Sequence, residues 1–597
     1  MNLSPLFHFP LLFFLFLAAC TTKFQPRPLD LTEPVRGWMI LSDNEEEGLY
    51  VIENAAGYNI NHLQISHHVI HSLRHVREED RRNLANRLTD AAHSAGIGEV
   101  VLWDRALHEL DYYPEQFRTG PGGTIDFDNP EFWHWFQDDY REMLDLVPDI
   151  QGLILTFIET GARAENQYSE KLTANQQKLA AVVNAVAEVV IGERGLNLYA
   201  RTFSYTYEEY DNIVGAVELF EWPEIRLMMK ETPHDFFLTH PNDFFAGTID
   251  RPTIMEFDSA AEFNGHGVIM NTWPEHVLDR WSDFLKRDHI IGYVARTDRY
   301  GDTRIVGRPS EINLLALKRY FEEPSLTADD LYEEFITKNY GEEALEYLQA
   351  AFENSFDYVT SVFYTLGIHS TDHSRLNYDP YPSHWARHAS GKWIDPPYAE
   401  IEHGVNKRFH YWTDVVNTLA PVWAKKGGTQ LDEIPWVIEN GWLDQNDNMN
   451  EEYLGYIITE KEYGIALAEE SLHKITEARD LLSEEDYEEL YQYFERSLLT
   501  ARLHRHTAAA YFGFRVYARG EEFRTDTLLE TMREALEQLP SAAREIETYP
   551  HPVPAGQWNW REDAVQAMWY YTTITETGWP AETGGYENPY GGMVFPL

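Results

Sequence analysis

The feature that most constrains the fold is an alternation of short apolar runs with longer, helix-like segments between residues 35 and 325. The helix-like segments include 77–95, 130–147 and 173–191, and the first ends at Gly96, a residue type common at helix C-termini. The runs that we predict as strands are VRGWMIL (35–41), HLQIS (62–66), EVVLWD (99–104), GLILTFIE (152–159), LNLYARTF (196–203), EIRLMMK (224–230), PTIMEF (252–257), GVIMN (267–271) and GYVAR (292–296). Strands that alternate with helices form parallel sheets, so this series predicts an α/β fold, a (β/α)8 TIM barrel over residues 35–325.

The chain changes character on both sides of this region. After residue 325 few strand-like runs remain, so a mainly α-helical C-terminal region is expected over 326–597. Before it, the stretch 20–34 holds three prolines and is predicted to be a tether. The histidine-rich segment 368–393 fits a loop that reaches toward a pocket and an ordinary surface loop equally well. The C-terminal segments with helical spacing are 327–365, 401–420, 450–483 and 485–515.

Residues 1–19 are predicted to be a lipoprotein signal peptide. They contain no Asp, Glu, Lys or Arg, and the apolar run LLFFLFL is too short to span a membrane but fits the core of a secretory signal. The stretch ends in LAAC, which resembles a bacterial lipoprotein cleavage site and implies that Cys20 carries the lipid. The expected location is therefore the cell envelope, at the outer membrane or in the periplasm. The alternative is a simple signal peptide followed by an incidental cysteine.

Composition narrows the classes of function. The chain carries 48 Lys and Arg against 98 Asp and Glu, a formal charge of −50, which repels phosphate backbones and argues against a nucleic-acid partner. Hydrophobic residues make up 43% of the chain, enough for a large core. Since Cys20 is the only cysteine, an intramolecular disulfide and a thiolate zinc site are excluded.

Charged residues stand at or near the ends of several predicted strands. The active site of a (β/α)8 barrel lies at the C-terminal ends of its strands. A charged group at the end of an apolar strand must be paired or solvated, so several together indicate a polar pocket. Opposed carboxylates in such a pocket are what glycoside hydrolysis needs, although each residue alone fits an ion pair or a helix cap as well. The residues are Glu159, Arg201, Lys230, Asp235 and Glu256.

Five short segments resemble, in their sequence and their order, the motifs of a known enzyme family. They are Leu146–Asp149 with Gly152–Gly161, Ala200–Tyr205, Lys230–Phe236, Met255–Gly265 and Thr297–Arg299. In this order they resemble the family 67 glycoside hydrolases, the α-glucuronidases that remove (4-O-methyl)glucuronic acid from xylan side chains. The likeness covers roughly residues 100–340.

This resemblance implies an inverting reaction and a role for each matched residue. Glu159 matches the general acid, and Asp235 and Glu256 match the two carboxylates on the base side. Arg201 and Lys230 match substrate-binding residues, and Asp298 and Arg299 match a motif near the last strand that we also assign to substrate binding. One departure is Leu155, which stands where the family has a lysine and so removes a cation expected to pair with the sugar carboxylate.

Further candidates come from the residues alone. His67 and His68 follow a predicted strand and could contact sugar hydroxyls. Together with His71 and His75 their spacing also allows a metal site, but pocket-rim or helix-surface histidines are the simpler interpretation. Trp103 is a candidate pocket residue, with filling of the barrel as the simpler role. We expect neither a cofactor nor a metal.

The expected function is an exo-acting, inverting, α-glucuronidase-like hydrolase that releases a uronic acid from an oligosaccharide or polysaccharide. Two alternatives remain open, a non-catalytic surface glycan-binding lipoprotein and a hydrolase of the same fold that acts on a neutral sugar. A membrane is expected as a partner only through the lipid anchor, and the oligomeric state is left open, a dimer included.

Overall fold

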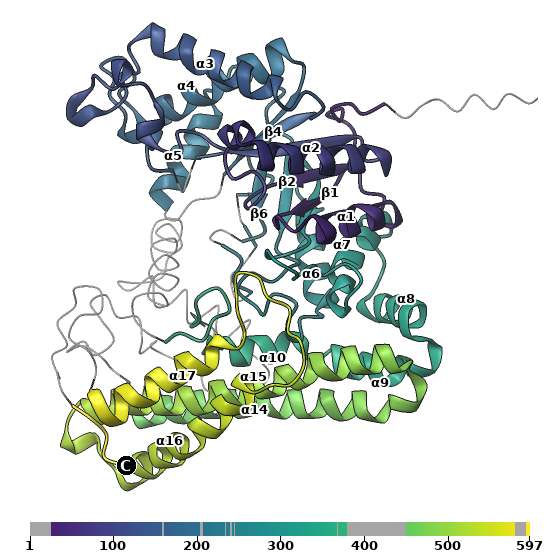
Figure 1. Cartoon of the computed structure of the whole chain (residues 1–597), viewed down its shortest axis with the longest axis vertical. Helices are drawn as coiled ribbons and strands as arrows, with labels where there is room; N and C mark the ends of the chain where they lie inside the picture. The colour runs from purple at the N-terminus through teal and green to yellow at the C-terminus, as the bar shows by residue number, and fades with distance from the viewer. Residues whose placement is uncertain are drawn as a thin grey trace, which may run out of the picture.

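Eight parallel strands close into a barrel in chain order, which confirms the predicted (β/α)8 architecture (Figure 1). This computed structural model describes residues 25–157, 160–202, 207–232, 235–238, 242–243, 245–366, 368–378, 449–578 and 593–597. The strands are β1 (Val35–Ile40), β2 (His62–Ile65), β3 (Glu99–Arg105), β4 (Gly152–Thr156), β5 (Asn197–Arg201), β6 (Arg226–Lys230), β7 (Thr253–Phe257) and β8 (Ile290–Arg296).

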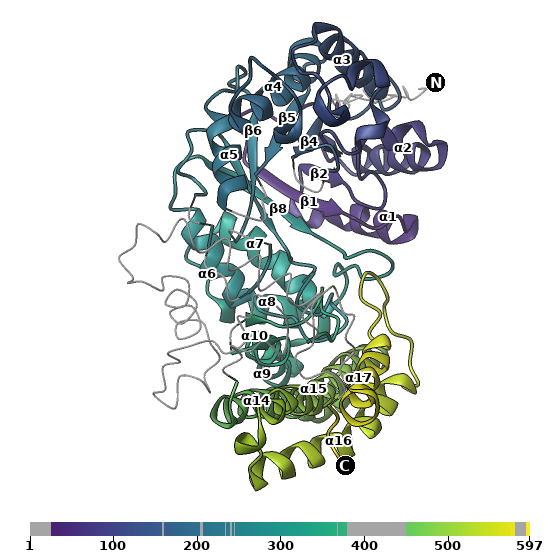
Figure 2. The same ribbon diagram turned by 90° about the vertical axis from the view of Figure 1, so that its left-hand side faces the viewer.

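Helices surround the barrel and then form a layer below it, as two perpendicular views agree (Figures 1 and 2). Those of the barrel are α1 (Glu45–Asn54), α2 (Glu79–Ser94), α3 (Pro130–Asp145), α4 (Asn175–Ala187), α5 (Tyr207–Val217), α6 (Pro274–Phe284) and α7 (Ile312–Glu322). The layer contains α8 (Ala328–Tyr340), α9 (Leu345–Phe352), α10 (Ser355–Val362), α14 (Glu451–Glu477), α15 (Glu484–Ala518), α16 (Asp526–Glu547) and α17 (Glu562–Thr572). Among the described helices, none combines the length and apolarity that a bilayer crossing requires.

Local chemistry explains where the helices begin and end. The side chain of Asn129 accepts a hydrogen bond from the Glu131 amide, and Pro130 follows at the first helical position, so α3 begins there. At the end of α2, Gly96 has a φ of 91°, and the amides of Gly96 and Ile97 donate to the carbonyls of His93 and Ala92. This is a Schellman ending, which favours glycine because of its left-handed backbone.

Eight of the nine runs predicted as strands form the barrel, but the prediction for GVIMN at 267–271 is wrong. This segment lies in the loop between β7 and α6, where its backbone bonds to α15 instead of to a strand. The Met270 amide donates to Ser497 Oγ at 2.9 Å and the Asn271 amide to Tyr493 OH at 2.7 Å. The apolar residues are buried against the helical layer, so hydrophobicity alone did not distinguish this loop from a strand. The predicted helix at 401–420 lies outside the described residues.

The N-terminal end of the barrel is closed by a buried polar network and a residue of the predicted tether. Glu99 lies 2.6 Å from His62 Nδ1 and accepts a 2.8 Å hydrogen bond from Tyr199 OH, which in turn accepts from Arg226. Leu29 packs in the cluster inside the barrel, its amide donates to Glu99 and its carbonyl accepts from Arg226. The part of the predicted tether around Leu29 is therefore seated in the barrel and is not a free linker.

At the other end of the barrel, the C-terminal helices contact the strand loops. The segment between α16 and α17, the yellow connection in Figure 1 that rises to the barrel, pairs with the loop after β8. The Ala555 amide donates to Asp302 Oδ1 at 2.5 Å, and the Gln557 amide donates to the Arg299 carbonyl at 3.1 Å. We call residues 549–561 the strap. It connects the helical layer to the loop that carries Arg299.

Candidate functional site

Charged side chains gather inside the C-terminal mouth of the barrel. Successive residues of a strand face opposite sides, and Trp103, Tyr199, Met228, Ile254 and Val294 belong to the cluster inside the barrel. The residues two positions later therefore also face inward, at the strand ends. They are Arg105, Arg201, Lys230, Glu256 and Arg296, each 5% exposed or less.

Glu256 lies at the centre of this group and holds two arginines. Its Oε2 accepts from Arg201 Nε at 2.7 Å, and its Oε1 accepts from Arg296 Nη2 at 2.8 Å and Nε at 3.1 Å. The carboxyl group is fully buried, which by itself would raise its pKa. The positive charges of Arg201, Arg296 and Lys230 outweigh this and lower the pKa of Glu256 to about 2. Glu256 is therefore an ionised carboxylate with both oxygens engaged.

Asp235 lies beside Lys230. Its Oδ1 is 2.6 Å from Lys230 Nζ, and its side chain is 14% exposed, more than that of Glu256. Asp235 has a φ of 54°, a left-handed conformation that is uncommon outside glycine. Such strain is found mostly at functional sites. Burial lowers the pKa of Lys230.

A third carboxylate, Glu262, binds Arg296 and Arg299. It is 2.5 Å from Arg296 Nη1 and also forms an ion pair with Arg299, while His373 Nε2 lies 3.6 Å away. Burial would raise the pKa of Glu262, but Arg299 and Arg296 hold it well below the usual range. Asp258, two residues after Glu256, is buried and has its pKa raised to about 7 by that burial.

Our sequence analysis did not name Glu262, Arg296, Asp258 or His373 as site residues, although His373 belongs to the segment 368–393 that it considered as a loop reaching toward a pocket. Arg296 ends a predicted strand, so the same rule that selected Lys230 could have found it. Glu262 lies in a loop and His373 comes from beyond the barrel, and no strand-end signal marks either residue.

Two residues that we assigned to substrate binding have other partners. Trp103 is 1% exposed and donates from Nε1 to Gln64 at 2.9 Å, with Arg201 4.8 Å above its ring, so the geometry fits the barrel-filling role. Asp298 is 2% exposed, and its two oxygens accept from the amides of Leu41 and Tyr300. This geometry supports a role in holding the ends of β1 and β8 together.

Arg299, His67 and His68 lie at the rim. Arg299 donates from Nε to Gln557 of the strap at 2.7 Å and stacks over Tyr300. The His68 side chain is 50% exposed, and His67 is half-buried with its Nδ1 2.9 Å from Ser66 Oγ. No group of three or more His, Cys, Asp or Glu residues within the described ranges is arranged to hold a metal ion.

Glu159, the predicted general acid, lies outside the described residues, and β4 is described only as far as Thr156 and the following Phe157. Leu155 belongs to the core between the barrel and the helices, whereas its neighbour Ile154 belongs to the cluster inside the barrel. The side chain at position 155 thus faces away from the mouth. The leucine at this position, where the family has a lysine, therefore removes no cation from the mouth, and the alternative of a neutral sugar stays a prediction.

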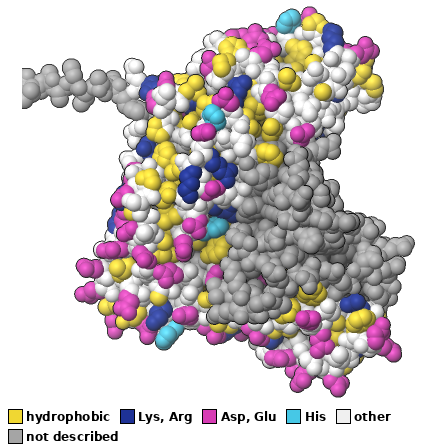
Figure 3. All heavy atoms as spheres, turned by 180° about the vertical axis from the view of Figure 1, so that it is seen from behind, with side chains coloured by type: hydrophobic (Ala, Val, Ile, Leu, Met, Phe, Trp, Pro, Cys, Tyr) yellow, Lys and Arg dark blue, Asp and Glu magenta, His cyan; other side chains and the backbone are white. Residues whose placement is uncertain are grey.

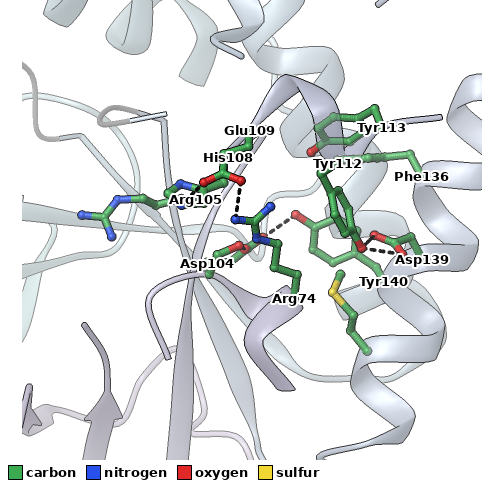
Figure 4. Close-up of a pocket in the computed structure, with 12 residues that line it drawn as sticks. Arg74, Asp104, Arg105, His108, Glu109, Tyr112, Tyr113, Phe136, Asp139 and Tyr140 are labelled. Atoms are coloured by element: carbon green, nitrogen blue, oxygen red, sulfur yellow. Dashed lines mark hydrogen bonds and ion pairs between the residues drawn. The ribbon is translucent and has the colours of Figure 1, made fainter. Parts of the chain in front are cut away.

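A small pocket beside the mouth is distinct from this site (Figure 4). It lies between β3 and α3, and Asp104 faces it while Arg105 points away, as alternation along β3 requires. Tyr140 donates to Asp104 at 2.5 Å and Arg74 pairs with Glu109 at 2.9 Å. The cavity of about 20 Å³ has room for about one water molecule, not for a sugar ring.

One face of the molecule carries a local group of basic side chains. On the face opposite to that of Figure 1, Lys and Arg side chains gather in one group at the middle, beside the undescribed residues (Figure 3). Acidic side chains are spread around the periphery of the same face. A chain with a charge of −50 thus still presents local positive potential.

No protein-family model and no curated protein matches the chain. Solved structures that resemble it are glycoside hydrolases. A GH138 enzyme targeting the pectin rhamnogalacturonan II is 11% identical, with a TM-score of 0.54 over 91% of this chain and 67% of that one. A GH115 4-O-methyl-α-glucuronidase with specificity for decorated arabinogalactans is 8% identical, with a TM-score of 0.46 over 93% and 64%. A mutant O-GlcNAc hydrolase from Thermobaculum terrenum is 10% identical, with a TM-score of 0.43 over 90% and 94%. At these identities the likeness concerns the fold alone.

Proposed function

We propose that this protein is an exo-acting, inverting glycoside hydrolase, similar to α-glucuronidases, that releases a uronic acid from an oligosaccharide or polysaccharide. One observation carries the proposal. Cations from four strands and a loop converge with carboxylates at the C-terminal mouth of the barrel, where catalysis by this fold takes place.

The charge balance of the mouth supports an anionic substrate. The described residues there include five cations, namely Arg105, Arg201, Lys230, Arg296 and Arg299. Four carboxylates oppose them, Asp235, Glu256, Glu262 and Asp298, while the raised pKa of Asp258 leaves that group largely protonated below pH 7. A sugar carboxylate would complement the excess of positive charge through charge-assisted hydrogen bonds.

We assign the catalytic roles as follows. Glu159 protonates the glycosidic oxygen, and Asp235 activates the water that attacks the anomeric carbon from the other side. Asp235 is favoured over Glu256 because both oxygens of Glu256 are bound by arginines, so that Glu256 is a positioning residue for Arg201 and Arg296. Inverting enzymes hold the acid and the base about 6.5–9.5 Å apart, which leaves room for water.

The experiment is hydrolysis of 4-nitrophenyl α-D-glucuronide and of oligosaccharides capped with α-linked uronic acids. We expect release of the free uronic acid, first seen by NMR as the β-anomer. Glu159→Gln and Asp235→Asn should each lower kcat by about 10²–10⁴-fold without unfolding the protein.

The matched control is Asp250→Asn, because Asp250 is 97% exposed in the loop between β6 and β7. It should keep the wild-type rate. A folded Glu159→Gln variant with a near-wild-type rate would contradict the assignment of the acid, and an α-anomer as first product would contradict inversion.

A second candidate, a glycan-binding protein without activity, is favoured by the engagement of both Glu256 oxygens. It predicts that uronic-acid oligosaccharides bind and are never cleaved. Equilibrium binding without product release over the whole panel would therefore replace the first proposal by this one.

We further infer that Cys20 is lipidated and anchors the chain to the cell envelope. The inference rests on the LAAC motif after an apolar run. We expect wild-type protein in the membrane fraction and Cys20→Ser protein in the soluble fraction. Equal distribution of the two would overturn it.

A further inference from the structure

A row of aromatic rings follows the rim of the barrel mouth from the loop after β8 to the loop after β3. Tyr300 stacks on His68, with ring centroids 3.8 Å apart and ring planes at 10°. His67 lies 5.9 Å from Tyr300 and 6.3 Å from His71, and His71 lies 5.1 Å from His108. We call these five rings the rim row.

The rim row is both accessible and held in place. Tyr300, His67 and His71 are half-buried, while the His68 side chain is half-exposed. The ring centroid of His67 is 5.0 Å from that of Trp103, and Arg201 of the mouth lies 4.8 Å from the same Trp103 ring. The row is thus continuous with the candidate site.

Backbone strain marks the same two loops. His67 has a φ of 43° and Tyr300 a φ of 70°, both in the left-handed region that residues with a Cβ rarely adopt. Strained residues persist where the surrounding structure holds them for a function. Two loops that are remote in sequence pay this conformational cost and thereby bring their rings together.

Hydrogen bonds set the tautomer of one ring of the rim row, His71, and of His75 beside it. Arg105 Nη1 lies 2.6 Å from His71 Nδ1, and the Ser72 amide donates to His75 Nδ1 at 3.3 Å. Because a guanidinium and an amide can only donate, both Nδ1 atoms accept, and the ring proton is on Nε2. Burial and nearby arginines lower the pKa of His67 and His75, the latter to about 4, so both rings are neutral at pH 7.

We propose that the rim row binds the leaving-group side of an acidic oligosaccharide, the sugars that follow the one held in the mouth. This rests on the proposed function. Flat ring faces suit the apolar faces of sugars, and imidazole N–H groups suit hydroxyl and carboxylate oxygens. Arg299 lies 4.5 Å from the Tyr300 ring and Arg105 contacts His71, so cations follow the row. The acids nearby are Asp43, 3.8 Å from His68, and Glu109, 3.7 Å from His108.

The test compares affinities for short and long ligands. The full chain carrying Asp235→Asn is titrated with galacturonic acid, glucuronic acid, and panels of uronic-acid-containing and neutral oligosaccharides of two to six sugars. The test variant adds His68→Ala and Tyr300→Ala, and the control adds His134→Ala, a 71% exposed histidine of α3. Circular dichroism confirms folding of each variant.

We expect acidic oligosaccharides of three or more sugars to bind. The double substitution should lower the affinity for these oligosaccharides at least tenfold more than it lowers the affinity for the monosaccharides. The His134→Ala control should bind as the parent does. Four results would each overturn the proposal for the rim row. Two concern the double variant: an equal loss of affinity for short and long ligands, or an unchanged affinity. The other two are equal binding of neutral oligosaccharides and no binding of any acidic oligosaccharide.

Hydrolysis by the wild-type chain, measured on the same panel, separates the two proposals. Turnover together with unchanged affinity in the double variant overturns the rim row alone. Binding that depends on the row, without any turnover, supports the row and overturns the hydrolase.

Discussion

At the scale of single residues, the mouth contains carboxylates of different kinds. Glu256 is buried, ionised and bound on both oxygens, whereas Asp235 is strained, more exposed and paired with one lysine. Glu256 lies at the C-terminal end of β7 and Asp235 in the loop after β6, so both residues are at the mouth. The surroundings of each carboxylate, and not its residue type, determine which chemistry it can perform.

Glu256→Gln should destabilise the fold by about 3 kcal/mol at pH 7, because it removes the charged carboxylate that Arg201 and Arg296 both bind while the two guanidinium groups stay buried. The folded-state pKa of Glu256, about 2, is below its ordinary value. Its contribution is therefore complete above the unfolded pKa and is lost as the pH falls from about 4.5 toward 2.

Thermal unfolding of wild type and variant across pH 2–8 measures this effect. The difference in Tm should be largest near neutral pH and should narrow below about pH 4.5. A difference that stays constant through the acid range would show that the charge of Glu256 does not stabilise the fold.

At the scale of elements, the strap places a C-terminal segment against the loop that holds Arg299. Gly556 allows this approach, because an added Cβ would meet the backbone carbonyl oxygens of Arg299 and Tyr300, the latter at 2.8 Å. The helical layer thus contributes to the geometry of the mouth through Gln557, which accepts from Arg299 Nε.

Gly556→Ala should lower kcat/KM by about tenfold to a hundredfold, because it displaces the loop that positions Arg299. The matched control is Gly57→Ala, since no atom lies within 4 Å of the Cβ that would be added there. Steady-state kinetics on one uronide substrate checks both variants. Wild-type kinetics for Gly556→Ala would mean that the strap has no part in positioning Arg299.

The barrel was predictable from the sequence because its strands are short, buried and mostly apolar runs separated by helix-like segments. Five of them, β3 and β5 to β8, also carry a charged residue at or next to their C-terminal end. The strand ends also led to Arg201, Lys230 and Glu256. The failure at 267–271 has a physical reason: a buried loop and a buried strand are equally apolar, and only the partner, here α15, distinguishes them. Glu262 had no signal in the sequence, and for His373 the composition of 368–393 indicated only that the segment could reach a pocket, because tertiary packing and not sequence spacing brings the two residues to Arg299 and to each other.

At the scale of the whole molecule, the N-terminal segment and the candidate site occupy opposite ends of the barrel. Leu29 closes the N-terminal end and is 5% exposed, while the charged mouth lies at the C-terminal end. In parallel barrels the first end serves stability and the second serves function. The molecule separates these two tasks along one axis.

Leu29→Ala should destabilise the protein by about 2–5 kcal/mol, because it opens a cavity in the cluster inside the barrel. Leu31→Ala is the matched control, since Leu31 is 38% exposed and should change stability by less than about 0.5 kcal/mol. Denaturant unfolding followed by tryptophan fluorescence measures both. Equal stability of the two variants would show that Leu29 does not close the barrel.

The position of Leu29 would also determine how the barrel is oriented relative to a membrane that holds a lipid on Cys20. Cys20 precedes Leu29 by nine residues, a reach of about 30 Å when fully extended. A lipid on Cys20 would hold the closed base of the barrel near the bilayer and turn the open end outward. Polymer termini arriving from the surrounding medium would then meet the opening directly.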